Sequence, residues 1–377
     1  ATADEEGRYR LPLAGPADSV VASAIGFAPL SRRVNKAASQ TVDFALRPGS
    51  VSLQEVVVRP RENPAYAIMR RVQQQKPRHD KRQLTAFEFD SYNRTEVSLR
   101  NLPAAVERRR MLRQITQLTD SLGLPRDSSG RPVVPIFASE VLSRFYQLNQ
   151  PLRKRELILR RQLRGAAPRE GSVVSQILGA SFQDWDFYLN WQQLLGKDFI
   201  SPIADGWRFT YEYELQDSVW VGEDFCYQLA VTPRRAQDLA FTGTIWITKR
   251  EYALRRLDLR VSPRANLNFV EQVRVSQELT PTPAGPWLPL RTQVLIGLKP
   301  TKGSTGVTAR FTTVNSKFDA GHPHPLPFYD RPLETAPEAF QTPADYFARH
   351  RPDSLSAPEQ ATLTALDSVQ QLPAVRS

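Results

Sequence analysis

The sequence is poor in the residues and motifs on which recognisable active sites depend. It has one cysteine, Cys226, so an internal disulfide framework and a cysteine-rich zinc site are both excluded. No apolar run approaches the roughly 20 residues that a membrane-spanning helix needs. A Gly-x-Ser-x-Gly elbow, a His-Glu-x-x-His helix, a phosphate loop and a dinucleotide fingerprint are all missing. The sequence therefore predicts no catalytic residues, no cofactor and no metal site.

The few remaining candidates for chemistry have simpler explanations. His322 and His324 are two residues apart, but the prolines around them predict an extended segment without a nearby acidic pair. Glu212 and Glu214 alternate with apolar residues, as on the solvent face of a strand, although an acidic hydrolase pair stays open as an alternative. Cys226 has no adjacent base and is interpreted as a small packing residue.

What the sequence has is the composition of an ordinary globular protein. Its 377 residues, 41% hydrophobic and 24% charged, indicate two or three domains with a packed core. Lysine and arginine number 50 against 39 aspartates and glutamates, which gives a formal net charge of +11. This charge favours anionic partners but does not bear on the fold.

Residues 1–60 predict a small β domain. Short β runs at 8–13, 19–25, 31–34 and 41–46 are separated by turn residues. About 45 residues are too few to bury two sheets without disulfides or metals. We therefore expect a β-sandwich that lacks its first strands.

Residues 61–318 predict a sheet domain with two helical insertions. Asn63 and Pro64 begin a helix that places Ala65, Ile68, Met69 and Val72 on one apolar stripe and that Pro77 ends. Strands are expected at 84–99 and 133–148, and a polar amphipathic helix between them at 105–122.

The segment 150–196 is expected to form the second helical insertion. A proline and a glycine suit the ends of a helix at 151–165, and basic residues form a patch between them: Arg153, Lys154, Arg160, Arg161 and Arg164. We interpret this anionic-partner patch as a solvated or partner-docking face, with an anionic lipid surface as the alternative. Nucleic acid is not expected as a partner, because no nucleic-acid-binding module accompanies the charge.

Residues 206–318 have the most regular pattern in the chain. Strands are predicted at 207–215, 224–231, 243–248, 253–261, 268–279, 287–298 and 307–318. No helix-length segment separates them, so they should pair antiparallel, hairpin by hairpin, in one curved sheet. Aromatic residues occupy one face of the first strand, and they are either packed core or the lining of a cavity for an apolar ligand: Trp207, Phe209, Tyr211 and Tyr213.

Residues 319–377 predict a linker followed by a last helix. Prolines and small polar residues dominate up to residue 343. The helix begins near Pro358, carries Leu363 and Leu366, and is expected to be an exposed tether.

Two groups of residues resemble known families. Asp4-Glu5-Glu6-Gly7-Arg8-Tyr9 and the segments 18–27, 44–46 and 53–58 resemble the carboxypeptidase-regulatory-like domain, a transthyretin-like β-sandwich without a peptidase site. That domain normally begins with two further strands. The order of the strands at 227–233, 243–247 and 255–260 is similar to the unclosed barrel of LolA-like periplasmic lipoprotein carriers.

A third resemblance covers most of the chain beyond residue 60. It is carried by Asn63-Pro64-Ala65-Tyr66, Tyr92-Asn93-Arg94 and the segments 135–140, 199–203 and 366–369. In this order they resemble an uncharacterised Bacteroidota cell-envelope family, in which a carboxypeptidase-regulatory-like domain and a conserved region precede an outer-membrane β-barrel. The resemblance implies that the chain is the periplasmic portion of a larger protein, at the periplasmic side of the outer membrane. Its partners would be that barrel or other envelope proteins.

The expected fold is mostly β with inserted helices: a partial transthyretin-like β-sandwich, then a curved antiparallel half-barrel. This fold and the resemblances together leave three hypotheses about function. The leading hypothesis is a non-enzymatic binding or scaffolding module of the cell envelope. The alternatives are a carrier or sensor of a lipid-like ligand under the curved sheet and, less favoured, a hydrolase with an unrecognised acidic site. The pattern predicts neither the ligand nor the oligomeric state.

Overall fold

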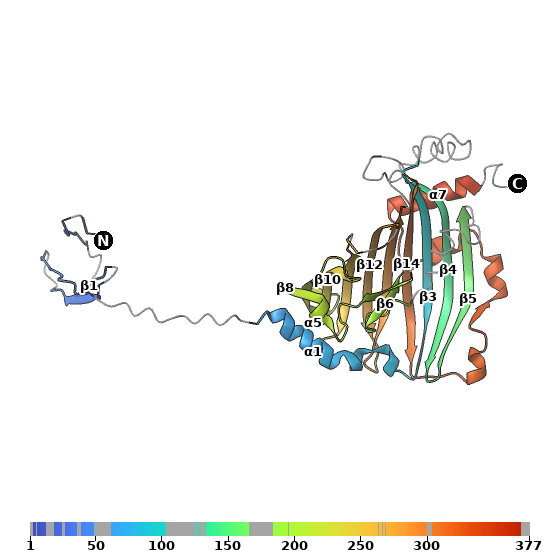
Figure 1. The fold of residues 1–377 in the computed structure, drawn as a ribbon, viewed down its shortest axis with the longest axis horizontal. Helices are drawn as coiled ribbons and strands as arrows, with labels where there is room; N and C mark the ends of the chain where they lie inside the picture. Colours follow the sequence, from blue (N-terminus) through green and yellow to red (C-terminus); the bar gives the residue numbers. More distant parts are fainter. Residues whose placement is uncertain are drawn as a thin grey trace. The chain divides into compact units, whose positions relative to one another are not determined.

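The computed structural model shows a chain dominated by one large β-sheet (Figure 1). It describes residues 3–4, 6–12, 19–24, 27–35, 39–48, 62–102, 126, 130, 133–165, 184–194, 196–262, 264–265, 267, 269–299 and 304–370. The chain divides into two compact units, residues 1–61 and 62–377.

The described part of the first unit contains one small hairpin. Strands β1 (Ser19–Ala22) and β2 (Leu30–Arg33) pair antiparallel, and the Tyr9 hydroxyl donates a hydrogen bond to the Val42 carbonyl (2.6 Å). The predictions of strands at 8–13 and 41–46 are wrong for the described residues, because 8–12 and 41–46 form no strand. The transthyretin-like sandwich stays a prediction.

The second unit is built on an eleven-stranded sheet in the order β15-β5-β4-β3-β14-β13-β12-β11-β10-β9-β8. Every neighbouring pair is antiparallel except β15 and β5, which are parallel. The strands are β3 (Ala86–Arg100), β4 (Val134–Asn149), β5 (Leu152–Gly165), β8 (Tyr211–Val221), β9 (Asp224–Pro233), β10 (Phe241–Thr248), β11 (Leu254–Val261), β12 (Val270–Pro281), β13 (Trp287–Leu298), β14 (Gly306–Ala320) and β15 (Leu333–Thr335). The predicted mostly β fold with one large curved sheet is confirmed.

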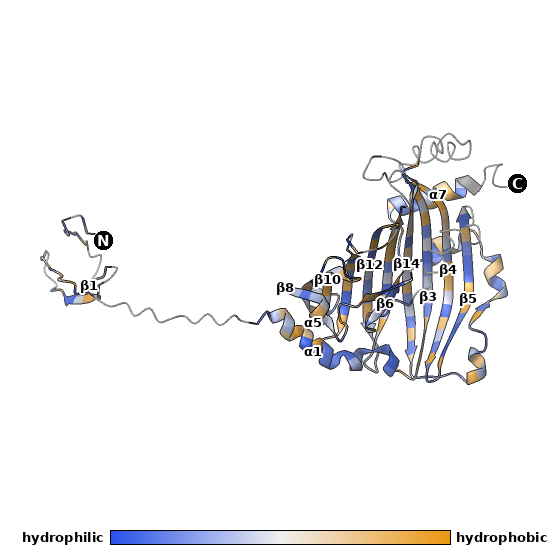
Figure 2. Cartoon of the chain, in the orientation of Figure 1, coloured by the Kyte–Doolittle hydropathy of each residue, from blue (hydrophilic) through white to orange (hydrophobic). Residues whose placement is uncertain are grey.

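One pairing joins distant parts of the sequence. Strand β3 lies beside β14, with Tyr92 opposite Val314 and Arg100 opposite Gly306. This pairing places the β3-β4-β5 hairpins at one end of the sheet and the β8–β13 meander at the other. The alternation of polar and apolar residues along these strands, visible in Figure 2, gives the sheet two different faces.

The inner face of the sheet carries the main core. Helix α1 (Pro64–His79), the hairpin of β6 (Trp191–Leu194) and β7 (Lys197–Ile200), and the short helix α5 (Trp207–Thr210) supply its covering side chains. The predicted apolar stripe of α1 is buried. Asn63 caps this helix, accepting a hydrogen bond from Ala65 N (2.9 Å) and donating one to the Tyr213 carbonyl (2.6 Å). Pro77 does not end the helix as predicted, and η1 (Lys81–Gln83) follows it.

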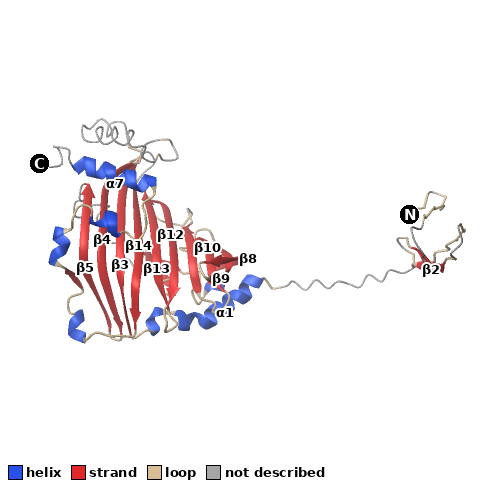
Figure 3. Ribbon diagram, turned by 180° about the vertical axis from the view of Figure 1, so that it is seen from behind, coloured by secondary structure: helices blue, strands red, loops and turns tan. Residues whose placement is uncertain are grey.

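The C-terminal residues cover the outer face of β3, β4 and β5. They form η3 (Leu326–Tyr329), β15, η4 (Pro337–Gln341), α6 (Tyr346–His350) and α7 (Ala357–Gln370), which lie along one edge and one end of the sheet (Figure 3). This differs from the predicted linker and exposed helix: β15 pairs with β5, and Leu363 and Leu366 are buried against Ala138. Prolines are compatible with this course because the segment makes few ladder hydrogen bonds.

The predicted basic helix at 151–165 is a β-strand. Strand β5 pairs with β4 from Leu152 opposite Asn149 to Gly165 opposite Phe137. Its arginines and leucines are good helix formers, but the long pairing with β4 outweighs that preference. The helix expected at 105–122 lies outside the described residues, as do residues 166–183 of the second predicted insertion.

Candidate ligand site on the inner face of the sheet

A cavity of about 200 Å³ lies on the inner face, over strands β3, β4, β5, β12, β13 and β14. Trp185, from the segment that leads into β6, borders it from above the sheet. We call it the inner-face cavity. The described residues that line it are Lys81, Phe87, Phe89, Ser91, Asn93, Ser143, Phe145, Gln147, Lys154, Glu156, Asp184, Trp185, Gln277, Pro289, Thr292, Val294, Ile296, Phe311, Thr313 and Asn315.

Phenylalanines form one wall of the cavity. The rings of Phe87 and Phe89 stack at 6.1 Å between centroids, and Phe145 stacks on Phe89 at 5.1 Å. They belong to two paired strands on which every second side chain points to the same face. Phe89 and Phe145 are only partly buried, so this wall presents apolar surface to the cavity.

A chain of hydrogen bonds crosses the floor of the cavity. Thr313 Oγ1 donates to Asn93 Oδ1 (2.7 Å), and Asn93 Nδ2 donates to Ser91 Oγ (3.1 Å). The Ser91 hydroxyl donates to Asn315 Oδ1 (2.8 Å), and Asn315 Nδ2 donates to the Pro289 carbonyl (2.8 Å). These side chains satisfy one another and give the floor a fixed polar stripe beside the aromatic wall.

Two lysines at the cavity are paired with aspartates. Lys81 Nζ lies 2.7 Å from Asp184 Oδ1 and 3.6 Å from Asp186 Oδ2, and Lys154 Nζ lies 3.3 Å from Asp184 Oδ2. Burial opposes the charge on Lys81, but Asp186 and Asp184 hold its pKa above the usual value. Burial likewise opposes the charge on Asp184, and Lys81 and Lys154 hold its pKa below the usual value. Both charges are therefore maintained near neutral pH.

Three buried polar groups at the cavity lack partners among the described residues. Gln147 and Gln277 donate through Nε2, to Asn149 and to the Trp185 carbonyl respectively, but neither Oε1 accepts a hydrogen bond. The third is the Ser143 hydroxyl, which lies beside the carboxyl group of Glu156. Burial raises the pKa of Glu156, and Ser143 opposes that shift. Unsatisfied buried acceptors are costly, so the cavity suits groups that donate hydrogen bonds at these positions.

The structure places the predicted apolar-ligand face elsewhere. Trp207 and Phe209 lie in α5 rather than on a strand, and β8 begins only at Tyr211. Trp207, Tyr211 and Tyr213 are buried in the main core, with the Tyr211 hydroxyl donating to the Ile200 carbonyl (2.6 Å), whereas Phe209 is 85% exposed. The strand prediction for 207–210 is wrong because the backbone makes one helical turn there before the strand begins.

Sequence reasoning missed the cavity residues of β3 and β4. The alternation of Phe87, Phe89, Ser91 and Asn93 was a usable signal for one face of a strand. It did not show that β14 would lie beside β3, and that pairing brings Thr313 and Asn315 to the same place.

The predicted basic patch is divided along β5. Arg153 and Lys154 are exposed, and Lys154 reaches the inner-face cavity. The guanidinium groups of Arg160 and Arg161 lie over the rings of Tyr346 (5.5 Å) and Phe340 (4.3 Å). Arg164 is buried beside Glu140 (2.7 Å). Three of the five residues thus contact the chain's own C-terminal segment or buried acid, and an anionic partner stays a prediction.

The minor candidates have local partners. The rings of His322 and His324 lie 2.7 Å from Asp319 and Glu88 respectively. In the described part of the chain, no group of three or more His, Cys, Asp or Glu side chains could hold a metal ion. Cys226 is buried, and burial raises the pKa of its thiol to about 12. None of the described helices has the length and apolar character required to cross a membrane.

Solved structures with similar folds cover most of the chain at very low identity. An outer membrane lipoprotein-sorting protein domain from Vibrio parahaemolyticus is 9% identical, covers 71% of this chain and 97% of its own, and has a TM-score of 0.30. A LolA superfamily protein from Nitrosomonas europaea is 11% identical, with coverages of 71% and 97% and a TM-score of 0.24. The Pseudomonas aeruginosa MucA/MucB complex gives 10% identity, coverages of 67% and 99%, and a TM-score of 0.20. The expected LolA-like resemblance is thus present but weak, and it bears on neither ligand nor activity.

Comparison with families gives a definite result. No curated protein matches the sequence. The model of a family of unknown function, DUF5686, matches residues 68–318, which is about two thirds of the chain. The matched region runs from the middle of α1 to near the end of β14 and contains most of the sheet. This protein therefore belongs to the DUF5686 family.

Proposed function

We propose that the chain is a non-enzymatic binding module and that the inner-face cavity is its ligand site. The observation that carries the proposal is the stacked wall of Phe87, Phe89 and Phe145, which borders the cavity and leaves Phe89 and Phe145 partly exposed there. Ligand sites typically combine apolar walls with a few fixed polar groups, and the hydrogen-bonded stripe at Ser91 and Asn93 supplies such groups here.

The size of the cavity limits the ligand. At about 200 Å³ it exceeds the roughly 150 Å³ of an apolar cavity that binds benzene, but it is below the roughly 300–1,000 Å³ of sites for drug-sized molecules. The site therefore suits one ring or one short stretch of acyl chain. The rest of a larger lipid would lie outside it.

The carboxylates of the cavity favour binding over hydrolysis. A hydrolase needs an acid and a base or nucleophile that are free to reach the substrate. The pKa values of Glu156 and Asp184 are shifted in opposite directions, as such a pair requires, but each oxygen of Asp184 is already bonded to a lysine. Asp184 is therefore occupied as a structural charge that holds Lys81 and Lys154.

We also propose that the module works in the cell envelope, at the periplasmic side of the outer membrane. The support is the resemblance of its ordered segments, from Asn63-Pro64 to the residues at 366–369, to a Bacteroidota envelope family. The partner would then be an outer-membrane barrel or another envelope protein. Fractionation of cells that express the natural protein tests this, and recovery in the cytoplasm would contradict it.

Native mass spectrometry tests the ligand site directly. The full chain is purified from an envelope fraction under conditions that retain bound lipid. We expect a discrete added mass that disappears on denaturation. A bare mass would contradict the ligand site and favour a scaffold that acts through protein contacts.

A matched pair of variants assigns the added mass to the cavity. Ser143→Phe places a ring where a small, fully buried side chain now lines the space, and it should remove the added mass. Ser316→Phe makes the same change at an exposed position of β14 and should leave the mass in place. Circular dichroism establishes that both variants are folded.

A further inference from the structure

Hydrogen-bond acceptors predominate among the described polar groups of the inner-face cavity that lack partners. Its two unpartnered amide oxygens, Oε1 of Gln147 and Oε1 of Gln277, are acceptors, and the carboxyl group of Glu156 lies beside the Ser143 hydroxyl. Both glutamine side chains are at least nine-tenths buried, with exposures of 4% and 1%. Their Nε2 groups are already used within the protein, which fixes the direction of each amide.

The cationic groups of the cavity are already neutralised. Lys81 is bonded to Asp184 and lies near Asp186, and Lys154 shares Asp184. Two lysines thus meet two aspartates, and Glu156 has no ion pair with a described residue. An anionic head group would have to compete with Asp184 for a lysine and would face the carboxyl group of Glu156.

The aromatic wall also favours a cationic head group over an anionic one. A cation is attracted to the face of an aromatic ring, and the effect is larger where water is excluded. The stacked rings of Phe89 and Phe145, together with Trp185, line the same cavity that Glu156 borders. Aromatic faces beside one carboxyl group are the combination that recognises ammonium groups in proteins.

We infer that the inner-face cavity selects an amphipathic ligand whose head group donates hydrogen bonds, with an ammonium group preferred over a hydroxyl and an anionic head disfavoured. This rests on the proposed function, because it assumes that the cavity takes an apolar chain. The chain would contact Phe87, Phe89 and Phe145, and the head group would meet Gln147 and Glu156, which lie on the neighbouring strands β4 and β5.

Three probes with the same chain and different heads test the inference. Octylamine, 1-octanol and octanoate are titrated into the full chain by isothermal titration calorimetry at about pH 7.5, where the amine is cationic and the acid anionic. We expect octylamine to bind most tightly and octanoate at least about tenfold more weakly than octylamine. The ammonium group gains a hydrogen bond to a charged acceptor, whereas the carboxylate of octanoate is repelled by Glu156, and together these effects change the affinity by at least that factor.

A matched pair of acid variants locates the preference. Glu156→Gln keeps the size and an acceptor but removes the charge, and it should reduce octylamine affinity to that of 1-octanol. Glu334→Gln makes the same change on β15, beside Arg155, and should leave all three affinities unchanged. Retention of the amine preference in Glu156→Gln would overturn the role of Glu156.

The outcomes separate this inference from the proposed function. Equal binding of the three probes would keep the apolar site and overturn the head-group selection. Tighter binding of octanoate would overturn it as well. Failure of all three to bind would contradict the proposed function itself and, with it, the inference.

Discussion

The two ends of the sheet are stabilised from opposite faces. At the β8–β12 end, large side chains fill the inner face: Phe187, Phe199, Tyr211 and Phe241 are all at most 1% exposed. At the β3–β5 end, the inner face keeps the cavity, and Phe89 and Phe145 are only partly buried. One sheet thus has a filled half and an open half.

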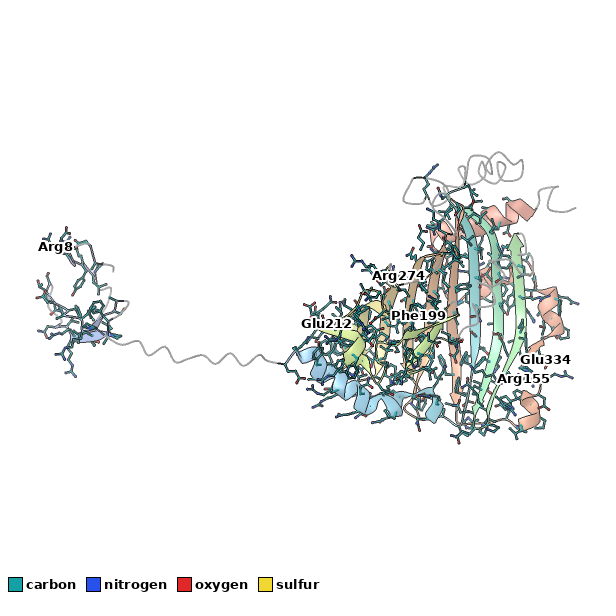
Figure 4. The ribbon with its side chains drawn as sticks, viewed as in Figure 1. Arg8, Arg155, Phe199, Glu212, Arg274 and Glu334 are labelled. Carbon is teal, nitrogen blue, oxygen red and sulfur yellow. The ribbon has the colours of Figure 1, made fainter. Side chains whose placement is uncertain are left out.

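The outer face explains how the open half is held together. There the C-terminal segment packs Phe347 against Tyr92 and Leu366 against Ala138. Arg155 on β5 and Glu334 on β15 form an ion pair of 2.7 Å at the edge of the sheet, where Figure 4 shows them side by side. Because the stabilising contacts lie on the outer face, the inner face can leave space for a ligand. The comparison of the two halves indicates that a sheet whose inner face leaves space for a ligand is stabilised by packing on its outer face.

A pair of phenylalanine truncations should give the largest difference between the halves. Phe241 is fully buried and contacts the rings of Phe187 and Phe199 at 5.6 and 5.5 Å between centroids. Phe241→Ala should cost about 3–5 kcal/mol of the free energy of unfolding, the usual effect of a large core truncation. Phe145→Ala should cost about 1–2 kcal/mol, because one face of its ring borders the cavity and makes no packing contacts there that the truncation could remove.

Urea denaturation of the two variants measures both values. Equal losses would show that the space beside Phe145 is filled in solution and would contradict the division into halves. If Phe145→Ala lowers the free energy of unfolding much less than Phe241→Ala, and the slope of that free energy with urea concentration is unchanged, the division into a filled and an open half is supported.

The sequence predicts the meander better than the rest of the sheet. From β9 to β14 every strand was predicted within a few residues, because short turns leave hairpin pairing as the simple solution. Strand β5 was predicted as a helix, since Arg160, Arg161 and their neighbours carry helical propensity and only the pairing with β4 reveals a strand. Local pattern contains no information about the partner of a strand that is distant in sequence.

The sequence predicts the type of site but not the residues that form it. An aromatic face under a curved sheet was expected, and the aromatic residues chosen at Tyr211 and Tyr213 are core. The cavity instead depends on the pairing of β3 with β14, which brings Ser91 and Asn315 together across more than 200 residues of sequence. That pairing is a long-range contact, and neither periodicity nor composition specifies it.

The smaller prediction concerns the outer face of the open half. Glu140 is fully buried and accepts hydrogen bonds from Arg351 (2.6 and 2.8 Å), Arg164 (2.7 Å) and the Tyr92 hydroxyl (2.7 Å). Glu140→Gln would leave two arginines without their buried counter-charge and should cost about 3 kcal/mol. The partly exposed pair of Glu334 is the control, and Glu334→Gln should cost at most about 1 kcal/mol.

The pH dependence of this loss identifies its cause. Burial would raise the pKa of Glu140, but the hydrogen bonds from Arg351, Tyr92 and Arg164 hold it below the usual value of 4.5. A carboxyl group whose pKa is lower in the folded chain stabilises it above the unfolded value and loses that contribution as the pH falls through the folded value. The stability gap between the wild type and Glu140→Gln should therefore be constant above about pH 5 and shrink below pH 4.5. A gap that stays constant down to about pH 3 would mean that shape, and not charge, holds the C-terminal segment against the open half.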